Sequence, residues 1–250
     1  MLKFINQHRS IRNFSDRPIE HEILENILYA GTRASTTGNM QVYSMIVTSE
    51  NKLKEQLWEA HFKQNMVKQA PIIITFCADF NRFIKWCQLN RAIPGYDNFL
   101  SFFTAAIDAL LASQNVALAA ETYSLGICYL GTTIYSAKKI IDILNIPKFV
   151  VPVASIVIGY PAESPDLTDR LPLNGILHFE KYIDYSAERI NEIFLEKESS
   201  DLTAKLLIEN NKETLAQIFT DNRYSKKDNV LFSQLFLKVI EEQGFMNNAE

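Results

Sequence analysis

The sequence predicts an α+β fold in which a central sheet is sandwiched between helices. Two runs, 71–78 and 150–159, are short, rich in β-branched residues and almost entirely apolar, which is typical of buried strands. The Ala/Leu-rich stretch 99–125 is apolar over much of its surface and predicts a long central helix. Helices and strands mix along the chain without strict βαβ alternation, which favours the α+β class.

The N-terminal half is expected to supply helices, two strands and a polar loop. Ser15-Asp16-Arg17-Pro18 combines helix-capping residues with an early proline, so a helix should start shortly after it. In that helix the apolar residues Ile23, Leu24, Ile27 and Leu28 recur at helical spacing, and Gly31 follows its end. In order, the predicted elements are helices at 2–8 and 20–30, a loop at 35–41, a strand at 43–48, a helix at 53–62 and the strand at 71–78.

The C-terminal half changes character after Pro172. A strand at 127–130, a helix at 136–144 and the strand at 150–159 are expected after the central helix, which Gly126 ends. Residues 182–243 are charged, helical in pattern and poor in strand signals. We therefore expect 1–250 to form a single domain, in which 182–250 is a helical extension packed on the core or on a partner subunit.

Composition excludes several classes of protein. With 47% hydrophobic residues the chain can bury a core, and a net charge of −4 with dispersed Lys and Arg argues against nucleic-acid binding. The most apolar stretch, 149–161, is interrupted by Pro152 and Ser155 and is too short to span a membrane. The N-terminus lacks the apolar run of a signal peptide, and the three cysteines form no C-x-x-C pair. A cytoplasmic protein without membrane or nucleic-acid partners is expected.

Common catalytic motifs are missing from the sequence. Gly126-x-x-x-x-Gly131 is followed by two threonines instead of the lysine of a phosphate-binding loop, and no G-x-G-x-x-G occurs. The four histidines show no metal-ligand spacing, and there is no G-x-S-x-G. A metal site and hydrolase chemistry are therefore not predicted.

Four segments carry residues suited to binding. His8-Arg9-Ser10-Ile11-Arg12 concentrates two guanidiniums, an imidazole and a hydroxyl, which suit a phosphate, although solvated surface arginines fit equally. The loop at 35–41 offers hydroxyls and amides to a ring edge, or is an ordinary polar connection. The strand that ends at Gly131-Thr132 would let backbone approach a flat ligand. The last segment, Asp166-Leu167-Thr168-Asp169-Arg170-Leu171-Pro172, places an arginine near a proline in a loop.

Taken in order, these segments resemble the nitroreductase family, especially its oxygen-insensitive NADPH nitroreductase and flavin reductase branch. The resemblance spans nearly the whole chain. The matching pieces are His8-Arg9-Ser10-Ile11-Arg12-x-Phe14, Ser35-Thr36 with Gln41, Gln64 ahead of Ala70-Pro71, Cys77-Ala78-Asp79-Phe80-Asn81-Arg82, Asp108 with Gln114-Asn115, Gly126-x-x-Tyr129-Leu130-Gly131, Leu144-x-x-Pro147, Gly159-Tyr160-Pro161, Pro165-Asp166-Leu167, Arg170-Leu171-Pro172 and Gln243-Gly244-Phe245.

The resemblance implies a mixed, mainly antiparallel sheet and non-covalently bound FMN at the interface of a homodimer. It implies hydride transfer from NADPH or NADH to the flavin, followed by reduction of nitroaromatic, quinone or flavin acceptors in a ping-pong cycle. No side-chain acid or base is required; Arg12 would stabilise charge on the reduced flavin. The implied cofactor-binding residues are His8, Arg9, Ser10, Arg12, Ser35, Thr36, Asn39, Gln41, Gln64, Tyr129, Leu130, Gly131, Thr132, Thr168 and Arg170, with Thr36, Asn39 and their neighbours coming from one subunit to complete the site.

Two positions depart from the family pattern. Thr168 stands where close relatives often carry a lysine for the phosphate, and Thr132 replaces a second glycine seen in some relatives. Binding of FMN could be weaker as a result. Arg223 lies roughly where the branch places an arginine for the NADPH 2′-phosphate, and a solvated charge run is the alternative. A non-enzymatic flavin- or nucleotide-binding protein on the same scaffold is the alternative function, and a specialised flavin reductase or a dehalogenase-like enzyme is a further enzymatic one.

Overall fold

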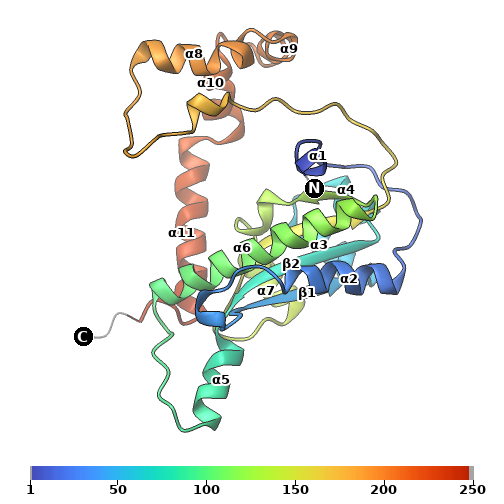
Figure 1. Cartoon of the computed structure of the whole chain (residues 1–250), viewed down its shortest axis with the longest axis vertical. Helices are drawn as coiled ribbons and strands as arrows, with labels where there is room; N and C mark the ends of the chain where they lie inside the picture. Colours follow the sequence, from blue (N-terminus) through green and yellow to red (C-terminus); the bar gives the residue numbers. More distant parts are fainter. Residues whose placement is uncertain (1, 248–250) are drawn as a thin grey trace. The chain divides into compact units, whose positions relative to one another are not determined.

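Four strands form one sheet within residues 2–247, the part of the chain that the computed structural model describes. Their order is β1-β2-β4-β3, and every neighbouring pair is antiparallel. Figure 1 labels β1 and β2 of this sheet. The bounds are Tyr43–Thr48 for β1, Ile72–Asp79 for β2, Gly126–Tyr129 for β3 and Val150–Gly159 for β4. The predicted strands agree with these bounds to within about a residue, and β2 and β4 are nearly continuous apolar runs.

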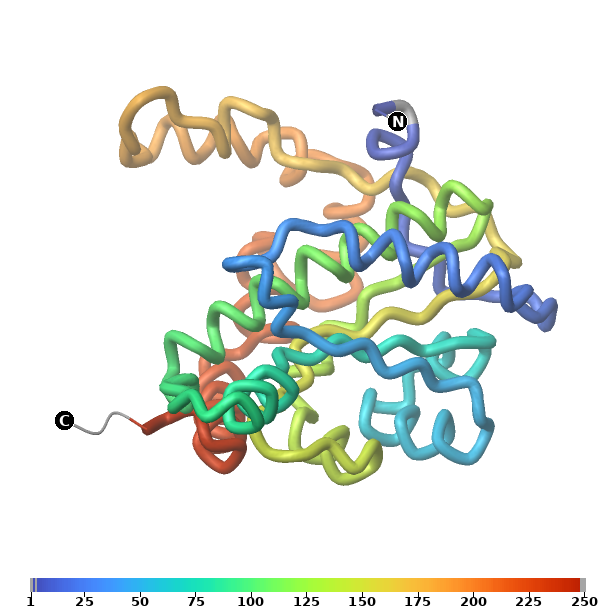
Figure 2. Tube along the Cα trace, turned by 60° about the horizontal axis from the view of Figure 1, so that its bottom comes forward, coloured from blue at the N-terminus to red at the C-terminus, as the bar shows by residue number. Residues whose placement is uncertain are grey.

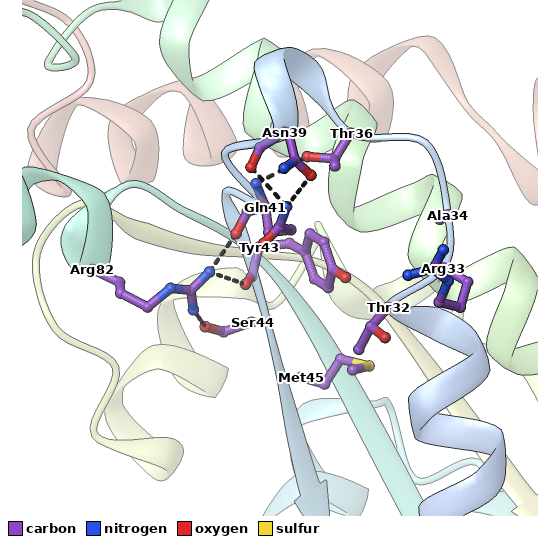
Figure 3. Close-up of a pocket in the computed structure, with 10 residues that line it drawn as sticks. All are labelled: Thr32, Arg33, Ala34, Thr36, Asn39, Gln41, Tyr43, Ser44, Met45 and Arg82. Carbon is purple, nitrogen blue, oxygen red and sulfur yellow. Dashed lines mark hydrogen bonds between the residues drawn. The ribbon is translucent and has the colours of Figure 1, made fainter.

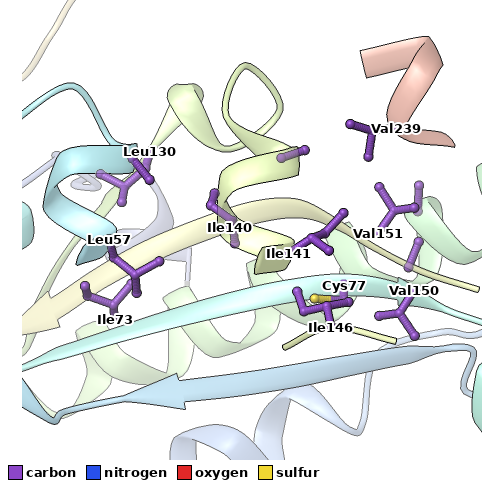
Figure 4. Close-up of a cluster of buried hydrophobic side chains, with 14 of the residues drawn as sticks. Leu57, Ile73, Cys77, Leu130, Ile140, Ile141, Ile146, Val150, Val151 and Val239 are labelled. Atoms are coloured by element: carbon purple, nitrogen blue, oxygen red, sulfur yellow. The ribbon is translucent and has the colours of Figure 1, made fainter. Parts of the chain in front are cut away.

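Both faces of the sheet are covered. On one face α2 (His21–Gly31) lies beside the long α6 (Phe99–Thr122), as Figure 2 shows, and Ile72, Ile74 and Phe76 of β2 point into this layer. On the other face lie α3 (Asn51–Ala60), α4 (Asn65–Gln69) and α7 (Ala137–Leu144). There Leu57, Ile73 and Ile140 belong to a second buried cluster (Figure 4). Successive side chains of β2 point to opposite faces of the sheet, so this strand contributes to the hydrophobic core on each face.

The central helix is shorter at its end than predicted. Asn98 caps α6 by accepting a hydrogen bond from Ser101 N at 3.0 Å, and the helix ends at Thr122 because Ser124 takes a positive φ of 60°. By length and composition α6 could cross a membrane, but half of its apolar window is buried. Its contacts with α2, β2 and β4 are those of a core helix.

The end of the chain returns to the sheet. Residues up to Asp166, together with those from Phe232 onward, form one compact unit, and Leu167–Leu231 forms another. In the first unit Gln243 donates from Nε2 to Pro147 O at 2.8 Å, and Phe149 N donates to Gln243 O at 2.9 Å. Phe245 is completely buried there. The C-terminal segment is thus part of the core.

The second unit is helical. Ser186, Ser200 and Thr214 cap successive helices with their hydroxyl groups, and Thr214 forms a capping box with Gln217. Its elements are η3 (Leu173–Gly175), α8 (Ala187–Glu198), α9 (Asp201–Asn210), α10 (Leu215–Gln217), η4 (Ile218–Arg223) and the start of α11 (Lys226–Glu242).

Several helices of the first unit differ from expectation. The predicted helix at 2–8 is limited to α1 (Leu2–Ile5), and the one at 53–62 ends at Ala60 because Phe62 and Lys63 have positive φ. Two further helices, α4 and α5 (Asn81–Leu89), were not predicted, because they are short and lack strong capping residues. Single turns form at η1 (Thr37–Asn39) and η2 (Gly131–Thr133).

Candidate functional site

The basic segment, residues 8–12, lies along the free edge of β3. Ile11 N donates to Ile127 O at 2.9 Å, and Ser15 N donates to Tyr160 O at 2.9 Å. Two glycines allow this approach: a Cβ on Gly126 would lie 2.6 Å from Ile11 Cγ1. A Cβ on Gly159 would similarly meet the ring of Phe14 at 2.9 Å. Close backbone packing therefore fixes the backbone positions of Arg9 and Arg12.

The side chains of the basic segment already have protein partners. His8 Nδ1 lies 2.5 Å from Glu121 Oε1 of α6, and Arg9 Nη1 donates to Pro165 O at 2.8 Å. The Glu163 carboxylate accepts from Arg12 N at 2.6 Å and from the Asn13 backbone, and these bonds lower the pKa of Glu163. The Arg12 side chain itself is exposed. A shallow depression of 350 Å³ lies beside Arg9.

Cys128 of β3 lies beneath this segment. Burial raises the pKa of its thiol, while the nearby Arg12 charge and a contact with Ser10 oppose the rise. Tyr129, the next residue, shares a hydrogen bond of 2.9 Å between its hydroxyl and Ser113 Oγ of α6. Leu130 N donates to Ser155 O at 2.8 Å, which anchors the end of the strand. Within residues 2–247 no heavy atom outside its chain neighbours lies within 4 Å of a Cβ built on Gly131.

A second group, the amide cluster, consists of His61, Gln64 and Thr132. Gln64 Nε2 donates to His61 O at 3.0 Å and to Thr132 Oγ1 at 3.2 Å. His61 Nδ1 lies 2.8 Å from the same hydroxyl oxygen. His61 is fully buried, and burial lowers its pKa to about 4, so the imidazole is neutral at neutral pH.

The polar loop at 35–41 is tied to α6 by one carboxylate. Asp108, which is only 1% exposed, accepts from Thr36 Oγ1 at 2.5 Å, Thr37 N at 3.0 Å and Thr37 Oγ1 at 3.1 Å. Gln41 N then donates to Thr36 Oγ1 at 3.0 Å, and Gln41 Nε2 donates to Asn39 Oδ1 at 2.6 Å. The loop is therefore held in one conformation, while Ser35 at its start is exposed.

Arg82 of α5 holds the end of the same loop. Its guanidinium donates to the carbonyl oxygens of Gln41 and Tyr43 and to Ser44 Oγ, as Figure 3 shows. Ser44 in turn donates to Asp79. A depression of 760 Å³ is lined by Arg82, Gln41, Tyr43 and Ser44 together with Thr32, Arg33, Ala34, Thr36, Asn39 and Met45.

Within one chain, the basic segment and the amide cluster both lie next to β3, whereas the polar loop at 35–41 is anchored elsewhere. Ser10 is next to Cys128, and Thr132 follows four residues later. The loop is anchored at Asp108 and the basic segment at Glu121, thirteen residues apart on α6. At 1.5 Å per residue this separates the two anchors by about 20 Å.

Three predicted site residues belong to the second unit. Arg170 Nη1 donates to Thr168 Oγ1 at 2.7 Å and to Asp169 O at 2.9 Å. All three residues of that turn are exposed. The Arg223 guanidinium lies 5.4 Å from the centre of the Phe219 ring. Their roles in binding stay predictions.

Sequence reasoning gave no role to three residues that organise these groups. Nothing in the sequence indicates a role for His61, because the histidines lack metal-ligand spacing and burial is a tertiary property. Arg82 and Asp108 were noted only as parts of matching motifs. A charged residue inside an otherwise apolar helix, as Asp108 is, was the one signal that a polar partner had to lie nearby.

Comparison with known proteins identifies the fold. A crystal structure of a Bacteroides fragilis NCTC 9343 protein superposes with a TM-score of 0.96 at 49% identity, covering 98% of this chain and 100% of that one. The NfrA1 nitroreductase from Bacillus subtilis superposes with a TM-score of 0.86 at 26% identity, covering 99% of both chains.

Sequence comparison agrees. The FMN reductase [NAD(P)H] of Bacillus subtilis (strain 168) is 30% identical over 98% of this chain and 97% of its own length. The oxygen-insensitive NADPH nitroreductase of Salmonella typhimurium (strain LT2) is 32% identical over 72% of this chain and 74% of its own length. The model of the family described as "Nitroreductase family" matches residues 5–160 of this chain. This chain belongs to the nitroreductase family.

Proposed function

We propose that this protein is an FMN-dependent NAD(P)H oxidoreductase of the nitroreductase and flavin reductase type. The relatives matched over most of the chain are reductases that carry FMN, NADPH or NAD(P)H in their names. The observation that carries the proposal is the convergence of the basic segment and the amide cluster along β3. The alternative of a non-enzymatic binding protein is not favoured, because those relatives are enzymes.

The residues along β3 fit a phosphate and a flat ring. His8, Arg9 and Ser10 supply cationic and hydroxyl donors for the phosphate, and a role for Arg170 stays a prediction from the family resemblance. Space at the Cβ position of Gly131 allows a ring to approach the backbone. His61 Nε2, beside Thr132, is buried and without a hydrogen-bond partner among residues 2–247.

When bound, FMN supplies the hydride acceptor for NAD(P)H and the two-electron donor for a nitroaromatic, quinone or flavin acceptor. The exposed Arg12 guanidinium is free to place a fixed positive charge near the bound cofactor. Glu163 accepts from Arg12 N and not from its guanidinium, so the backbone is held while the charged head stays available. Gln64 and the backbone at Leu130–Gly131 offer polar contacts to the ring edge.

The active form in this proposal is a homodimer. The two α6 residues that anchor the loop at 35–41 and the basic segment lie about 20 Å apart, so a second chain is needed to bring Thr36 and Asn39 to the cofactor. One face of α6 exposes a row of apolar side chains at helical spacing, which favours pairing with a second copy. The exposed residues are Phe99, Phe103, Ile107, Leu110 and Leu111.

The dimer is tested with a charged substitution on this row. Leu111→Glu should give a monomer in analytical ultracentrifugation and lower the affinity for FMN. Leu89→Glu is the matched control, since Leu89 is 85% exposed on α5, away from the row. A Leu111→Glu protein that stays dimeric with unchanged FMN affinity would contradict the proposed interface.

The function is tested by absorbance spectroscopy of the purified protein. Oxidised-flavin bands should bleach on anaerobic addition of NADPH or NADH and return when a quinone or nitroaromatic is added. Comparing how readily NADPH and NADH bleach the flavin bands determines the nucleotide preference of the wild-type protein. If Arg223→Gln slows bleaching by NADPH and not by NADH, a contact between Arg223 and the 2′-phosphate is supported. A protein that takes up no FMN, even after incubation with the cofactor, would overturn the assignment.

A cytoplasmic location is proposed with this function, supported by three free, buried cysteines and by the demand for reduced nucleotide.

A further inference from the structure

The amide cluster has a geometry that determines which atom it presents to a ligand. His61 ends α3 as its C-cap, and Phe62 and Lys63 follow with positive φ of 56° and 58°. This tight reversal places Gln64, the N-cap of α4, so that its side chain folds back onto His61 O. Thr132 reaches the same point from η2, after β3.

The orientation of the Gln64 amide follows from its neighbours. A backbone carbonyl oxygen can only accept, so the amide nitrogen has to face His61 O, 3.0 Å away. The same nitrogen donates its second hydrogen to Thr132 Oγ1 at 3.2 Å. Both amide hydrogens therefore point inward, and Oε1 accepts no hydrogen bond from the described part of the chain. Gln64 offers an acceptor to a ligand and not a donor.

The hydroxyl group of Thr132 can act as a donor to His61 while it accepts from Gln64. Because Thr132 Oγ1 accepts from Gln64, its own hydrogen is available for His61 Nδ1 at 2.8 Å. A neutral imidazole with an accepting Nδ1 carries its hydrogen on Nε2. That nitrogen is the buried atom with no partner in residues 2–247. His61, Thr132 and Gln64 thus form one directed chain of hydrogen bonds.

We propose that the Thr132 hydroxyl donates to His61 Nδ1 and accepts from Gln64 Nε2, so that His61 and Thr132 act as positioning residues, which lock the Gln64 amide with its carbonyl oxygen facing the cofactor site as an acceptor for a ring N–H group. The inference rests on the proposed function for the identity of the ligand. Thr132 stands where some relatives carry glycine, so this lock is a feature of this chain's own residues. Neither His61 nor Thr132 needs to touch the ligand.

A double-mutant cycle on FMN affinity tests the lock. Thr132→Val keeps the side-chain shape and removes the hydroxyl, so the dissociation constant for FMN should rise about threefold to tenfold. Thr132→Ser should restore wild-type affinity. In a Gln64→Ala background Thr132→Val should have no further effect, because Thr132 acts only through Gln64. Equal losses in both backgrounds, or a Thr132→Ser protein as weak as Thr132→Val, would overturn the proposal.

A second readout needs no cofactor. The nitrogen chemical shifts of the His61 ring in the FMN-free protein, assigned with His61→Asn, report which nitrogen is protonated. The proposal requires hydrogen on Nε2 in wild type and a mixture of tautomers in Thr132→Val. An Nδ1-protonated ring in wild type refutes it. If wild type binds no FMN, the proposed function fails, and the tautomer measurement still decides the lock.

Discussion

Replacing Gly126 by alanine should displace the basic segment from β3. The added Cβ would lie 2.6 Å from Ile11 Cγ1, 2.7 Å from Ile11 Cβ and 2.9 Å from Ile11 Cγ2. Ordinary carbon contacts begin near 3.5 Å, so Ile11 has to retreat by about 1 Å. A β-branched side chain cannot rotate its own Cβ away, and the backbone must therefore move. That movement weakens the hydrogen bond from Ile11 N to Ile127 O.

Overpacking costs about 1–3 kcal/mol and the weakened hydrogen bond about 0.5–1.5 kcal/mol. The free energy of unfolding should therefore fall by about 2–4 kcal/mol, which for a chain of this size lowers Tm by about 5–15 °C. Because residues 8–12 move with Ile11, the dissociation constant for FMN should rise about tenfold.

The assay is thermal unfolding of the FMN-free protein, followed by titration with FMN. Gly95→Ala is the control, since a Cβ on Gly95 meets no heavy atom within 4 Å in the described chain. Trimming Ile11 should relieve the clash, so Gly126→Ala combined with Ile11→Ala should be less damaging than the sum of the single changes. Additive effects, or a Gly126→Ala protein with wild-type Tm and FMN affinity, would refute the reasoning.

Three further predictions concern single side chains. Asp108→Asn should lower the free energy of unfolding by roughly 1.5–3 kcal/mol and accelerate amide exchange at Thr37, with the exposed Asp142→Asn as control. Burial lowers the pKa of His61 from 6.5 to about 4, so below about pH 6.5 the unfolded chain binds a proton that the native state does not. Urea unfolding should show stability falling by ~1.4 kcal/mol per pH unit between those values from this group, and His61→Asn should lack that component. Hydrogen bonds from the Tyr160 hydroxyl and then from Arg17 lower the pKa of Glu20 to about 2. The ionised Glu20 carboxylate therefore contributes to the stability of the fold above pH 4.5, and this contribution is lost as the pH falls toward 2. Acid titration of Glu20→Gln should lack that loss, and an unchanged profile would contradict it.

The strands and the long helix could be predicted because their signals are local. β2 and β4 are continuous apolar runs, and 99–122 is a long helical stretch. The short helices α4 and α5 could not, because tertiary packing of residues such as Val67 and Ile84 stabilises them more than their own sequence does.

The candidate site was predictable as residues but not as contacts. The motif at 8–12 indicates a cationic segment, yet nothing local indicates that His8 meets Glu121 across 113 residues of chain. The burial of His61 likewise depends on elements far apart in the sequence, since Thr132 reaches it only after β3 has paired. Hydrogen-bond partners of this kind follow from topology and not from spacing.

The packing of residues 239–245 against the sheet sets the order of events during synthesis. Phe245 and Ile240 fill positions beside Phe149 and β4, and Gln243 satisfies the carbonyl oxygens of Pro147 and Val150. A nascent chain that has emerged only as far as Asp166 has all four strands but not this closing segment. Its sheet stays uncovered at that point while residues 167–231 are still being added. The core is therefore completed only after residues 239–245 have been synthesised, and a stop codon shortly before Val239 should yield an aggregating product.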